Sequence, residues 1–481
     1  MIWEHRPGSI VMLTKLVEGG KRKCELYWPE KVGDTFKAGC GIHVQYKEVV
    51  PFADFEIKKF IVTNDQKPKV PALEVQHFQF LSWPDHGVPK FSTALISFIR
   101  RLRQYHNPQS AMLVHCSAGV GRTGAFILLD SMLEKIASES SVNVYECLTK
   151  MRQQRIHLVQ TLVQYVFIHD ALVELVTCGD TSVPAKALRG HIKKMVRNIP
   201  GGDVSGFTAQ FRLLARVSRK PSDSDNSEGL APHNKDKNRY PGRIPYNMNR
   251  VRLKPTGVSG AEYINASFLD GYKQKNAYMA AQAPVAATVN DFWRMVWEFK
   301  SRAVVMLCQL EENGQEMSHQ YWPTQLKAKQ LYGKNSVTLI SEEHPFGAKE
   351  IVVRKFEITD EKNTAVFTVT QYHVLCWAEE GKMAAGLLLQ MISDLNKLQR
   401  NTENKPITVV CNDGMGRTGA FICVHAMLDR VNSEHILDFF QFVKSSRINR
   451  PDIIREEEHY VMCHEAVAEY LDSFQTYANF T

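Results

Sequence analysis

The stretch His115-Cys116-Ser117-Ala118-Gly119-Val120-Gly121-Arg122-Thr123-Gly124 decides the fold around it. An apolar run at 112–114 precedes this stretch, and the apolar positions of 122–136 suit a buried helix of about four turns. The order is therefore strand, tight glycine loop and helix. Since glycine has no side chain to block an anion, such a loop can turn its backbone N–H groups inward at the helix N-terminus. The sequence predicts an α/β or α+β fold with an anion-binding loop.

The loop combines a thiol with a cation. Arg122 offers a planar fork of donors that suits a tetrahedral dianion such as phosphate. The same field lowers the pKa of Cys116 and makes it a nucleophile, and Thr123 is placed to hydrogen-bond the sulfur as it leaves. The alternative is a buried structural cysteine beside a glycine turn. Nucleotide hydrolysis is disfavoured, because neither copy of the motif has the lysine that precedes the hydroxyl residue of an ATP-binding loop.

The chain repeats itself. Val410-Cys411-Asn412-Asp413-Gly414-Met415-Gly416-Arg417-Thr418-Gly419 matches the loop at an offset of 295 residues, and flanking tryptophans match at an offset of 294. We expect two tandem domains, at 1–185 and 186–481, with a flexible insertion near 217–237, where apolar periodicity is weak. Residues 185–294 have no counterpart before Met1, so the first domain is expected to lack its front end.

A carboxylic acid is also needed, because an ester oxygen that leaves phosphorus requires a proton. Trp83-Pro84-Asp85-His86-Gly87-Val88-Pro89 supplies one about 30 residues before the loop, and its two prolines and its glycine suit a lid that closes over substrate. Short strands are predicted at 78–80 and 366–374 from alternating apolar positions.

Together with Gln160-Thr161-x-x-Gln164-Tyr165, these motifs resemble the cysteine-dependent protein tyrosine phosphatases. The tandem arrangement and the junction after Cys178 resemble the cytoplasmic half of a receptor-type phosphatase of the leukocyte-antigen-related group. The resemblance covers nearly the whole chain. It implies two copies of a twisted mixed sheet flanked by helices.

The resemblance also implies a mechanism of hydrolysis for phosphotyrosine on proteins. Cys116 would form a phosphocysteine intermediate while Arg122 binds the transferring group. Asp85 would protonate the tyrosyl oxygen and then accept a proton from water, which Gln160 and Gln164 would place. The loop residues expected to bind the phosphoryl group are Ser117, Ala118, Gly119, Val120 and Gly121.

Two charged residues near the start of the chain carry supporting roles in the same resemblance. Glu18 would orient Arg122, and Lys23 would contact the loop that carries Asp85. Without the motif around Lys23, both would be interpreted as solvated surface charges.

The second copy departs from this pattern. It keeps Cys411 and Arg417, but Glu379 stands at the acid position. Asp413 puts a carboxylate beside the thiol, which should oppose thiolate formation and phosphate binding. The hypothesis is a domain with little or no activity that serves regulation, docking or redox sensing.

Elements before the second loop resemble the family's phosphotyrosine-recognition segment. Tyr240 in Lys237-Asn238-Arg239-Tyr240 is placed to stack on a substrate ring, although Gly242 replaces an expected aspartate. Two rival functions remain open: a dual-specificity or lipid phosphatase, and a pseudophosphatase or scaffold that binds phosphoproteins without turnover.

Composition bounds the remaining classes. The chain has 481 residues, 59 basic against 51 acidic, and a net charge of +8, so a nucleic-acid partner rests on weak grounds. Ten cysteines form no C-x-x-C pair, and we expect reduced thiols, no metal site and no cofactor. The expected partners are phosphotyrosine-containing proteins, with regulatory contacts through the second domain. The expected location is cytoplasmic, with membrane attachment only through a parent receptor's spanning segment.

Overall fold

The computed structural model of the protein describes residues 1–84, 87–346, 349–360, 365–378, 381–400 and 405–478. The chain divides into two compact units, Met1–Asp180 (unit 1) and Thr181–Thr481 (unit 2). Both are layered arrangements of a mixed sheet and helices, as the sequence predicted.

Over its described residues, unit 1 forms a six-stranded sheet in the order β4-β5-β6-β7-β1-β8. The first four strands of this order pair antiparallel, and β1 runs parallel to both β7 and β8. The strands are β1 (Ser9–Met12), β4 (Thr35–Gly39), β5 (Ile42–Pro51), β6 (Phe55–Asn64), β7 (Leu73–Phe80) and β8 (Met112–His115). The predicted strand at 78–80 is confirmed as the end of β7.

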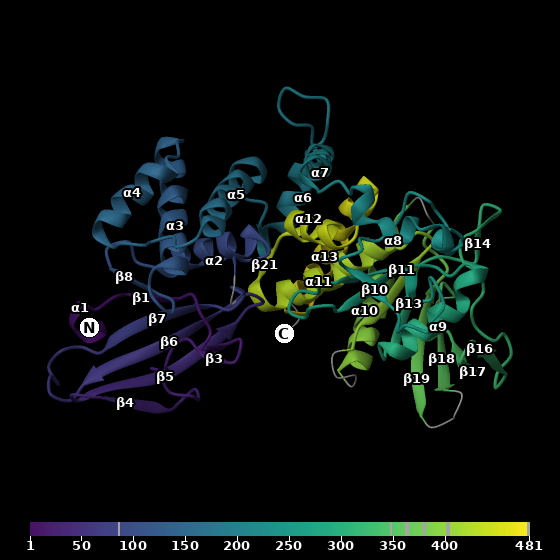
Figure 1. Ribbon diagram of the computed structural model, residues 1–481, viewed down its shortest axis with the longest axis horizontal. Helices are drawn as coiled ribbons and strands as arrows, with labels where there is room; N and C mark the ends of the chain where they lie inside the picture. Colours follow the sequence, from purple (N-terminus) through teal and green to yellow (C-terminus); the bar gives the residue numbers. More distant parts are fainter. Residues whose placement is uncertain (85–86, 347–348, 361–364, 379–380, 401–404, 479–481) are drawn as a thin grey trace. The chain divides into compact units, whose positions relative to one another are not determined.

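Helices cover one side of this sheet (Figure 1). They are α2 (Ser92–Tyr105), α3 (Gly121–Glu139), α4 (Val144–Gln154) and α5 (Leu162–Cys178), with a short α1 (Ile2–His5) at the start. A small hairpin, β2 (Val17–Glu18) and β3 (Lys21–Arg22), follows β1. The helix predicted after the glycine loop is confirmed as α3, whose apolar face meets the core beside β8.

Unit 2 repeats this plan with more strands. Its described residues form a nine-stranded sheet in the order β10-β11-β12-β20-β13-β19-β18-β17-β16. The strands are β10 (Arg250–Arg252), β11 (Tyr263–Leu269), β12 (Tyr278–Gln282), β13 (Ala303–Met306), β16 (Lys329–Tyr332), β17 (Asn335–Glu343), β18 (Ile351–Asp360), β19 (Val366–Val374) and β20 (Ile407–Cys411). The predicted strand at 366–374 is confirmed.

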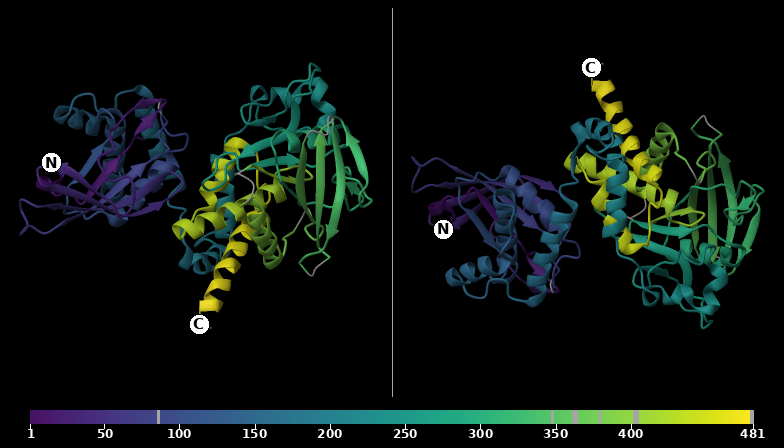
Figure 2. Two further views of the ribbon diagram at one scale, coloured as in Figure 1. Left: turned by 90° about the horizontal axis from the view of Figure 1, so that it is seen from below. Right: turned by 90° about the horizontal axis from the view of Figure 1, so that it is seen from above.

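The helices of unit 2 enclose a deeply buried core. Almost every residue of the first half of α11 is buried, and α13 packs on α10 and α11. Figure 2 shows α13 in yellow on the side of this unit away from the green strands β16–β19. The helices are α6 (Leu188–Val196), α7 (Gly206–Val217), α8 (Ser227–Leu230), α9 (Val289–Glu298), α10 (Ala385–Gln399), α11 (Gly416–Glu434), α12 (Phe439–Asn449) and α13 (Glu457–Ala478). Short elements complete it: 3₁₀ turns η1 (Ala185–Ala187), η2 (Asp223–Asp225), η3 (Pro232–Lys237) and η4 (Ala286–Thr288), and strand pairs β14 (Glu311–Glu312) with β15 (Gln315–Glu316) and β9 (Val183–Pro184) with β21 (Ile436–Leu437).

The order of strands shows that the two units share the same six-stranded arrangement over their described residues. The order β16 to β20 in unit 2 reproduces the order β4 to β8 in unit 1, and β12, β11 and β10 then extend the sheet beyond β20. As a result β20 is fully buried, whereas β8, at the edge of the described sheet in unit 1, is only half-buried.

The segment 217–237 contains more regular structure than its weak apolar periodicity indicated. It forms η2, α8 and η3, and the last two lie against β11. The reason is local hydrogen bonding: Asn234 Nδ2 donates to the Glu228 carbonyl at 2.9 Å, and Asn238 Nδ2 donates to the Gly229 carbonyl at 2.9 Å. Polar residues that looked like a solvated loop therefore satisfy the backbone of short turns.

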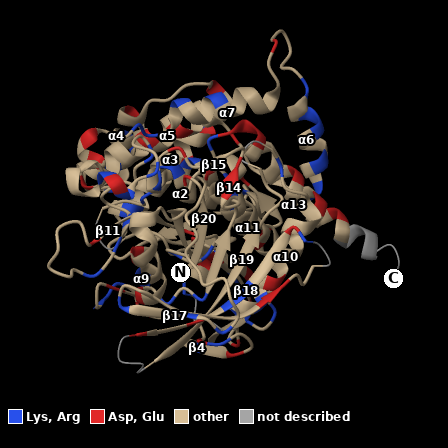
Figure 3. Cartoon of the chain, turned by 90° about the vertical axis from the view of Figure 1, so that its right-hand side faces the viewer, with Lys and Arg blue, Asp and Glu red and all other residues tan. Residues whose placement is uncertain are grey.

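In Figure 3 blue and red residues are scattered over the visible elements, and α6 shows only blue ones. The pair Glu311 and Glu312 of β14 stands out in red, and Glu312 belongs to the site described below. Within the described ranges, no helix combines the length and apolar character that a membrane crossing needs.

Candidate active site

The glycine loop of unit 1 lies between β8 and α3 and wraps around one thiol. The N–H of Gly119 donates to Cys116 Sγ at 3.3 Å. Gly119 has φ of 72°, a conformation that favours glycine. Val120 then caps α3, so the loop delivers its N–H groups to the helix N-terminus as the sequence predicted.

The surroundings of Cys116 favour its ionised form. Burial acts to raise the pKa of the thiol, but the nearby Thr123 hydroxyl and the N–H groups of Thr123, Gly119 and Val120 lower it by more. The pKa of Cys116 therefore lies below the ordinary thiol value. A thiolate at this position is a nucleophile at neutral pH.

Arg122 is held beside the loop by a two-pronged ion pair. Its Nη1 and Nη2 each donate to one carboxylate oxygen of Glu18 at 2.8 Å. Two further donations, to the carbonyls of Leu13 and Pro84, fix the plane of the guanidinium at 3.0 Å each. The side chains of Arg122 and Glu18 are 13% and 5% exposed. The predicted role of Glu18 in orienting Arg122 therefore has a geometric basis.

We expect Glu18→Gln to remove a pH-dependent contribution to the stability of unit 1. Burial acts to raise the pKa of Glu18, but donors from Arg122, Lys15 and Thr14 hold it at about 2, below the ordinary 4.5. A depressed pKa means that the ionised carboxylate stabilises the fold above the ordinary value, and that this contribution fades as pH falls towards 2. The variant should lose about 2 kcal/mol at pH 7 and much less near pH 3.

Urea unfolding of the wild type and the variant at both pH values measures this difference. Glu25→Gln is the control, because Glu25 pairs with Arg22 at an exposed position where ion pairs contribute little. A Glu18→Gln effect that is equal at both pH values would contradict the prediction.

Two glutamines lie directly over the loop. A Cβ placed on Gly121 would come within 3.0 Å of Gln164 Nε2 and 3.4 Å of Gln160 Oε1, so only glycine leaves both amides in place. The N–H of Gln160 donates to Gln164 Oε1 at 3.0 Å, and Thr161 caps the first turn of α5, on which Gln164 lies. The predicted pair is thus brought to the loop, where amides can hold a water.

A chain of three rings leads from the core to the loop. His115 Nδ1 lies 3.2 Å from the carbonyl oxygen of Cys116, which can only accept, so this nitrogen carries a proton. Burial lowers the pKa of His115 and keeps its ring neutral, so Nε2 accepts from the Tyr27 hydroxyl at 2.7 Å. The Tyr27 oxygen in turn accepts from His77 Nε2 at 2.8 Å. This directional chain fixes the Cys116 carbonyl.

Unit 2 places its counterparts differently. Cys411 is completely buried, and burial together with the charge of Asp413 raises the pKa of its thiol. Arg417, 1% exposed, donates to Glu312 Oε1 at 2.7 Å, which mirrors the Arg122–Glu18 pair. Unit 2 therefore keeps the arginine of the loop, but its cysteine is buried and its thiolate form is disfavoured.

The Asp413 carboxylate sits inside the second loop. Its Oδ1 accepts from the N–H of Met415 at 2.8 Å and from the N–H of Gly416 at 3.3 Å. The Cys411 thiol lies 3.3 Å from the same oxygen. Its Oδ2 forms an ion pair with Arg243 at 2.9 Å.

Tyr240 also meets the second loop. The Tyr240 hydroxyl accepts from Asn412 Nδ2 at 3.4 Å, and its ring stacks under the guanidinium of Arg243 at 4.0 Å. The predicted stacking surface of Tyr240 is therefore covered by a cation of the same chain.

The geometry of both loops agrees with the comparisons with known proteins. The family model described as "Protein-tyrosine phosphatase" matches residues 1–174 and 234–469. The chain belongs to the protein tyrosine phosphatase family. It is 41% identical over 484 residues to receptor-type tyrosine-protein phosphatase F of Homo sapiens, covering 99% of this chain and 25% of that protein.

Two further relatives of this phosphatase chain are of the same type. It is 41% identical to receptor-type tyrosine-protein phosphatase S of Gallus gallus, covering 99% of this chain and 31% of the relative. It is 39% identical to receptor-type tyrosine-protein phosphatase alpha of Homo sapiens, covering 100% of this chain and 59% of the relative. The chain thus spans less than two thirds of the length of these relatives.

Some predicted site residues of this phosphatase chain cannot be placed. Asp85 and Glu379 lie outside the described residues. The flanks of the two acid loops are alike, since Trp83 Nε1 donates to the Gly87 carbonyl and Trp377 Nε1 to the Gly381 carbonyl, each at 3.2 Å. Lys23 is half-buried, and its N–H donates to the Leu16 carbonyl at 2.8 Å.

One residue of the site was missed by sequence reasoning. Arg155 donates from Nε to the Gly119 carbonyl at 3.0 Å and from Nη2 to the Ala118 carbonyl at 3.3 Å. By holding these carbonyls outward, Arg155 leaves the N–H groups of the loop facing the thiol. The repeat carried a signal: Arg450, at the same offset as the cysteines, donates to the Asp413 carbonyl at 3.0 Å.

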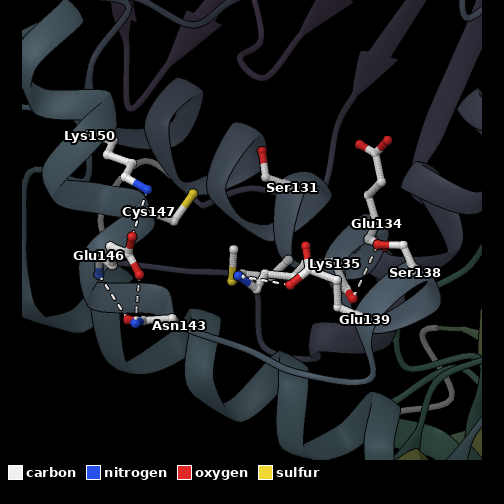
Figure 4. Close-up of a pocket in the computed structure, with 10 residues that line it drawn as sticks. Ser131, Glu134, Lys135, Ser138, Glu139, Asn143, Glu146, Cys147 and Lys150 are labelled. Atoms are coloured by element: carbon white, nitrogen blue, oxygen red, sulfur yellow. Dashed lines mark hydrogen bonds and ion pairs between the residues drawn. The ribbon is translucent and has the colours of Figure 1, made fainter.

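A separate groove of about 350 Å³ lies between α3 and α4 of unit 1 (Figure 4). Each wall of the groove carries an ion pair along its own helix: Lys135 pairs with Glu139 on α3, and Lys150 pairs with Glu146 on α4. Since it contains none of the predicted catalytic residues, it is not the active site.

Proposed function

We propose that unit 1 hydrolyses phosphotyrosine on proteins, with Cys116 as the nucleophile. The observation that carries this proposal is a thiol of lowered pKa that accepts a loop N–H, next to an arginine held flat by Glu18. This arrangement presents a nucleophile and anion-binding donors to the same phosphorus atom.

In the first step, the Cys116 thiolate attacks phosphorus and a sulfur–phosphorus bond forms. The bond between phosphorus and the tyrosyl oxygen breaks, and Asp85 gives its proton to that oxygen. Arg122 and the N–H groups of the loop neutralise the charge on the equatorial oxygens.

In the second step, water attacks the phosphocysteine. Gln160 and Gln164, which lie over Gly121, position this water, and the ionised Asp85 accepts its proton. The sulfur–phosphorus bond breaks, inorganic phosphate leaves, and Cys116 returns as a thiolate that the Thr123 hydroxyl stabilises.

Unit 2 is proposed to have little or no phosphatase activity and to serve regulation or docking. The raised pKa of Cys411 and the carboxylate of Asp413 inside its loop favour this role. Because the relatives are named receptor-type, we also propose that the chain works at the cytoplasmic face of the plasma membrane as part of a longer receptor.

The test is phosphate release from a phosphotyrosyl peptide by the whole chain, with and without vanadate. A phosphoseryl peptide and a phosphoinositide run beside it. We expect vanadate-sensitive hydrolysis of the tyrosyl peptide at a rate at least about a hundredfold above the other two. Preference for the phosphoinositide would favour a lipid phosphatase, and binding of the tyrosyl peptide without turnover would favour a scaffold.

A further inference from the structure

The Asp413 carboxylate occupies the position in unit 2 that an anion would take in a phosphate-binding loop. Two backbone N–H groups at the start of α11, those of Met415 and Gly416, point at its Oδ1 at 2.8 and 3.3 Å. These are the orphan donors that a helix N-terminus offers to an anion. They are therefore already satisfied from within the chain.

Cations complete the same arrangement. Arg243 Nη1 lies 2.9 Å and Arg455 Nη1 lies 3.7 Å from Asp413 Oδ2. The Asp413 side chain is only 7% exposed, so little water screens these pairs. The carboxylate thus has donors or cations on both oxygens, as a bound ligand has.

The other unit of the chain offers a direct comparison. Ala118 stands at the position of Asp413, at the same offset of 295 residues. An alanine has no polar group, and in unit 1 the N–H of Val120, the counterpart of Met415, acts on the Cys116 thiol instead. The two loops share their glycines and arginine, and at this position only the loop of unit 2 carries a carboxylate.

A second, independent group faces the second loop. Both ring nitrogens of His459 are buried and have no hydrogen-bond partner among the described residues. The ring lies against Gly416, where an added Cβ would come within 3.5 Å of Nδ1. A polar ring left without partners beside an anion loop is a group that a ligand oxygen could satisfy.

We propose that Asp413 is an internal ligand that fills the oxyanion site of unit 2, and that removing its carboxylate opens this site to inorganic phosphate. A phosphate dianion cannot share the loop with the carboxylate, because two anions this close repel each other strongly in a buried site. Without the carboxylate, the N–H groups of Met415 and Gly416 and the charges of Arg243 and Arg455 have no anion to bind. Phosphate supplies one.

The test uses the whole chain and measures the reactivity of Cys411 separately from that of the other cysteines. Alkylation by iodoacetamide is followed at each cysteine by peptide mass spectrometry, with and without inorganic phosphate. In the wild type, Cys411 should react slowly and phosphate should have no effect. In Asp413→Ala, Cys411 should react at least about tenfold faster, because its thiolate is no longer opposed, and phosphate should slow the reaction again.

The control for this arm is Asp236→Ala, which removes an exposed carboxylate of η3 from the same unit. It should leave Cys411 slow and insensitive to phosphate. Phosphate protection of Cys411 in the wild type, or its absence in a folded Asp413→Ala protein, would overturn the proposal. This readout does not depend on phosphatase activity, so it fails or succeeds separately from the proposed function.

The reciprocal variant, Ala118→Asp, keeps the proposal testable if Asp413→Ala does not fold. This arm rests on the proposed activity of unit 1. A carboxylate at 118 should fill the first loop and lower kcat/KM on a phosphotyrosyl peptide at least about a hundredfold, with a matching loss of inhibition by vanadate. Ala118→Asn, similar in size and uncharged, should lose less. Equal losses in the two variants, or unchanged activity in Ala118→Asp, would overturn the proposal.

Discussion

Cys116→Ser is expected to lower the hydrolysis of a phosphotyrosyl peptide by a factor of roughly 10⁴ or more. The loop N–H groups and Thr123 bring the pKa of a thiol below its ordinary value, but a serine hydroxyl starts so much higher that the same donors leave it protonated. Without an anionic nucleophile, no covalent intermediate forms. Phosphate release under saturating peptide measures the loss.

The same substitution in unit 2 is the matched control. Cys411 is fully buried, its pKa is raised, and Asp413 lies against it, so Cys411→Ser should change hydrolysis less than about twofold. Cys116→Ser should still bind the peptide, since Arg122 and its partner Glu18 are untouched. A loss in Cys411→Ser as large as that in Cys116→Ser would contradict the assignment of catalysis to unit 1.

The fold could be predicted where the signal is local. The run 112–114, the glycine loop and the apolar periodicity after Arg122 gave β8 and α3, because strand, turn and helix each follow from neighbouring residues. The order of strands could not be obtained this way. β1 lies between β7 and β8, and this pairing joins Met12 to His115 across about a hundred residues.

The site residues likewise divide into those that a local motif indicates and those that only the three-dimensional fold brings together. Cys116 and Arg122 stand in one compact motif, so residue type and spacing pointed to them, whereas Gln160 and Gln164 were predicted from the family resemblance. Arg155 was missed because an arginine that binds the carbonyls of Ala118 and Gly119 looks in sequence like any exposed helix end.

Asp413 was recognised only in part. Its charge beside the thiol could be inferred from the sequence, but its acceptance of the Met415 and Gly416 N–H groups depends on the three-dimensional course of the loop. His459 illustrates a similar limit. Its residue type allows a positive charge, yet burial lowers the pKa of His459 to about 4 and keeps its ring neutral.

Arg122→Lys is expected to lower kcat/KM about a thousandfold, although it keeps the positive charge. The arginine makes four donations at once, to both oxygens of Glu18 and to the carbonyls of Leu13 and Pro84. A lysine has a single ammonium group and no planar fork, so it cannot hold these partners and also meet two phosphoryl oxygens. Most of the loss should appear in kcat, because the equatorial oxygens gain charge in the transition state.

Arg417→Lys is the control that separates the chemical role of Arg122 from its structural role. Arg417 is 1% exposed and pairs with Glu312 as Arg122 pairs with Glu18, so the same substitution disturbs a similar buried network in unit 2. We expect Arg417→Lys to lower the unfolding temperature of unit 2 and to leave phosphotyrosyl hydrolysis within about twofold of the wild type. Comparable loss of activity from both variants would contradict this, since it would mean that the arginine acts through stability alone. If only Arg122→Lys is inactive, the planar fork acts on the phosphoryl group itself.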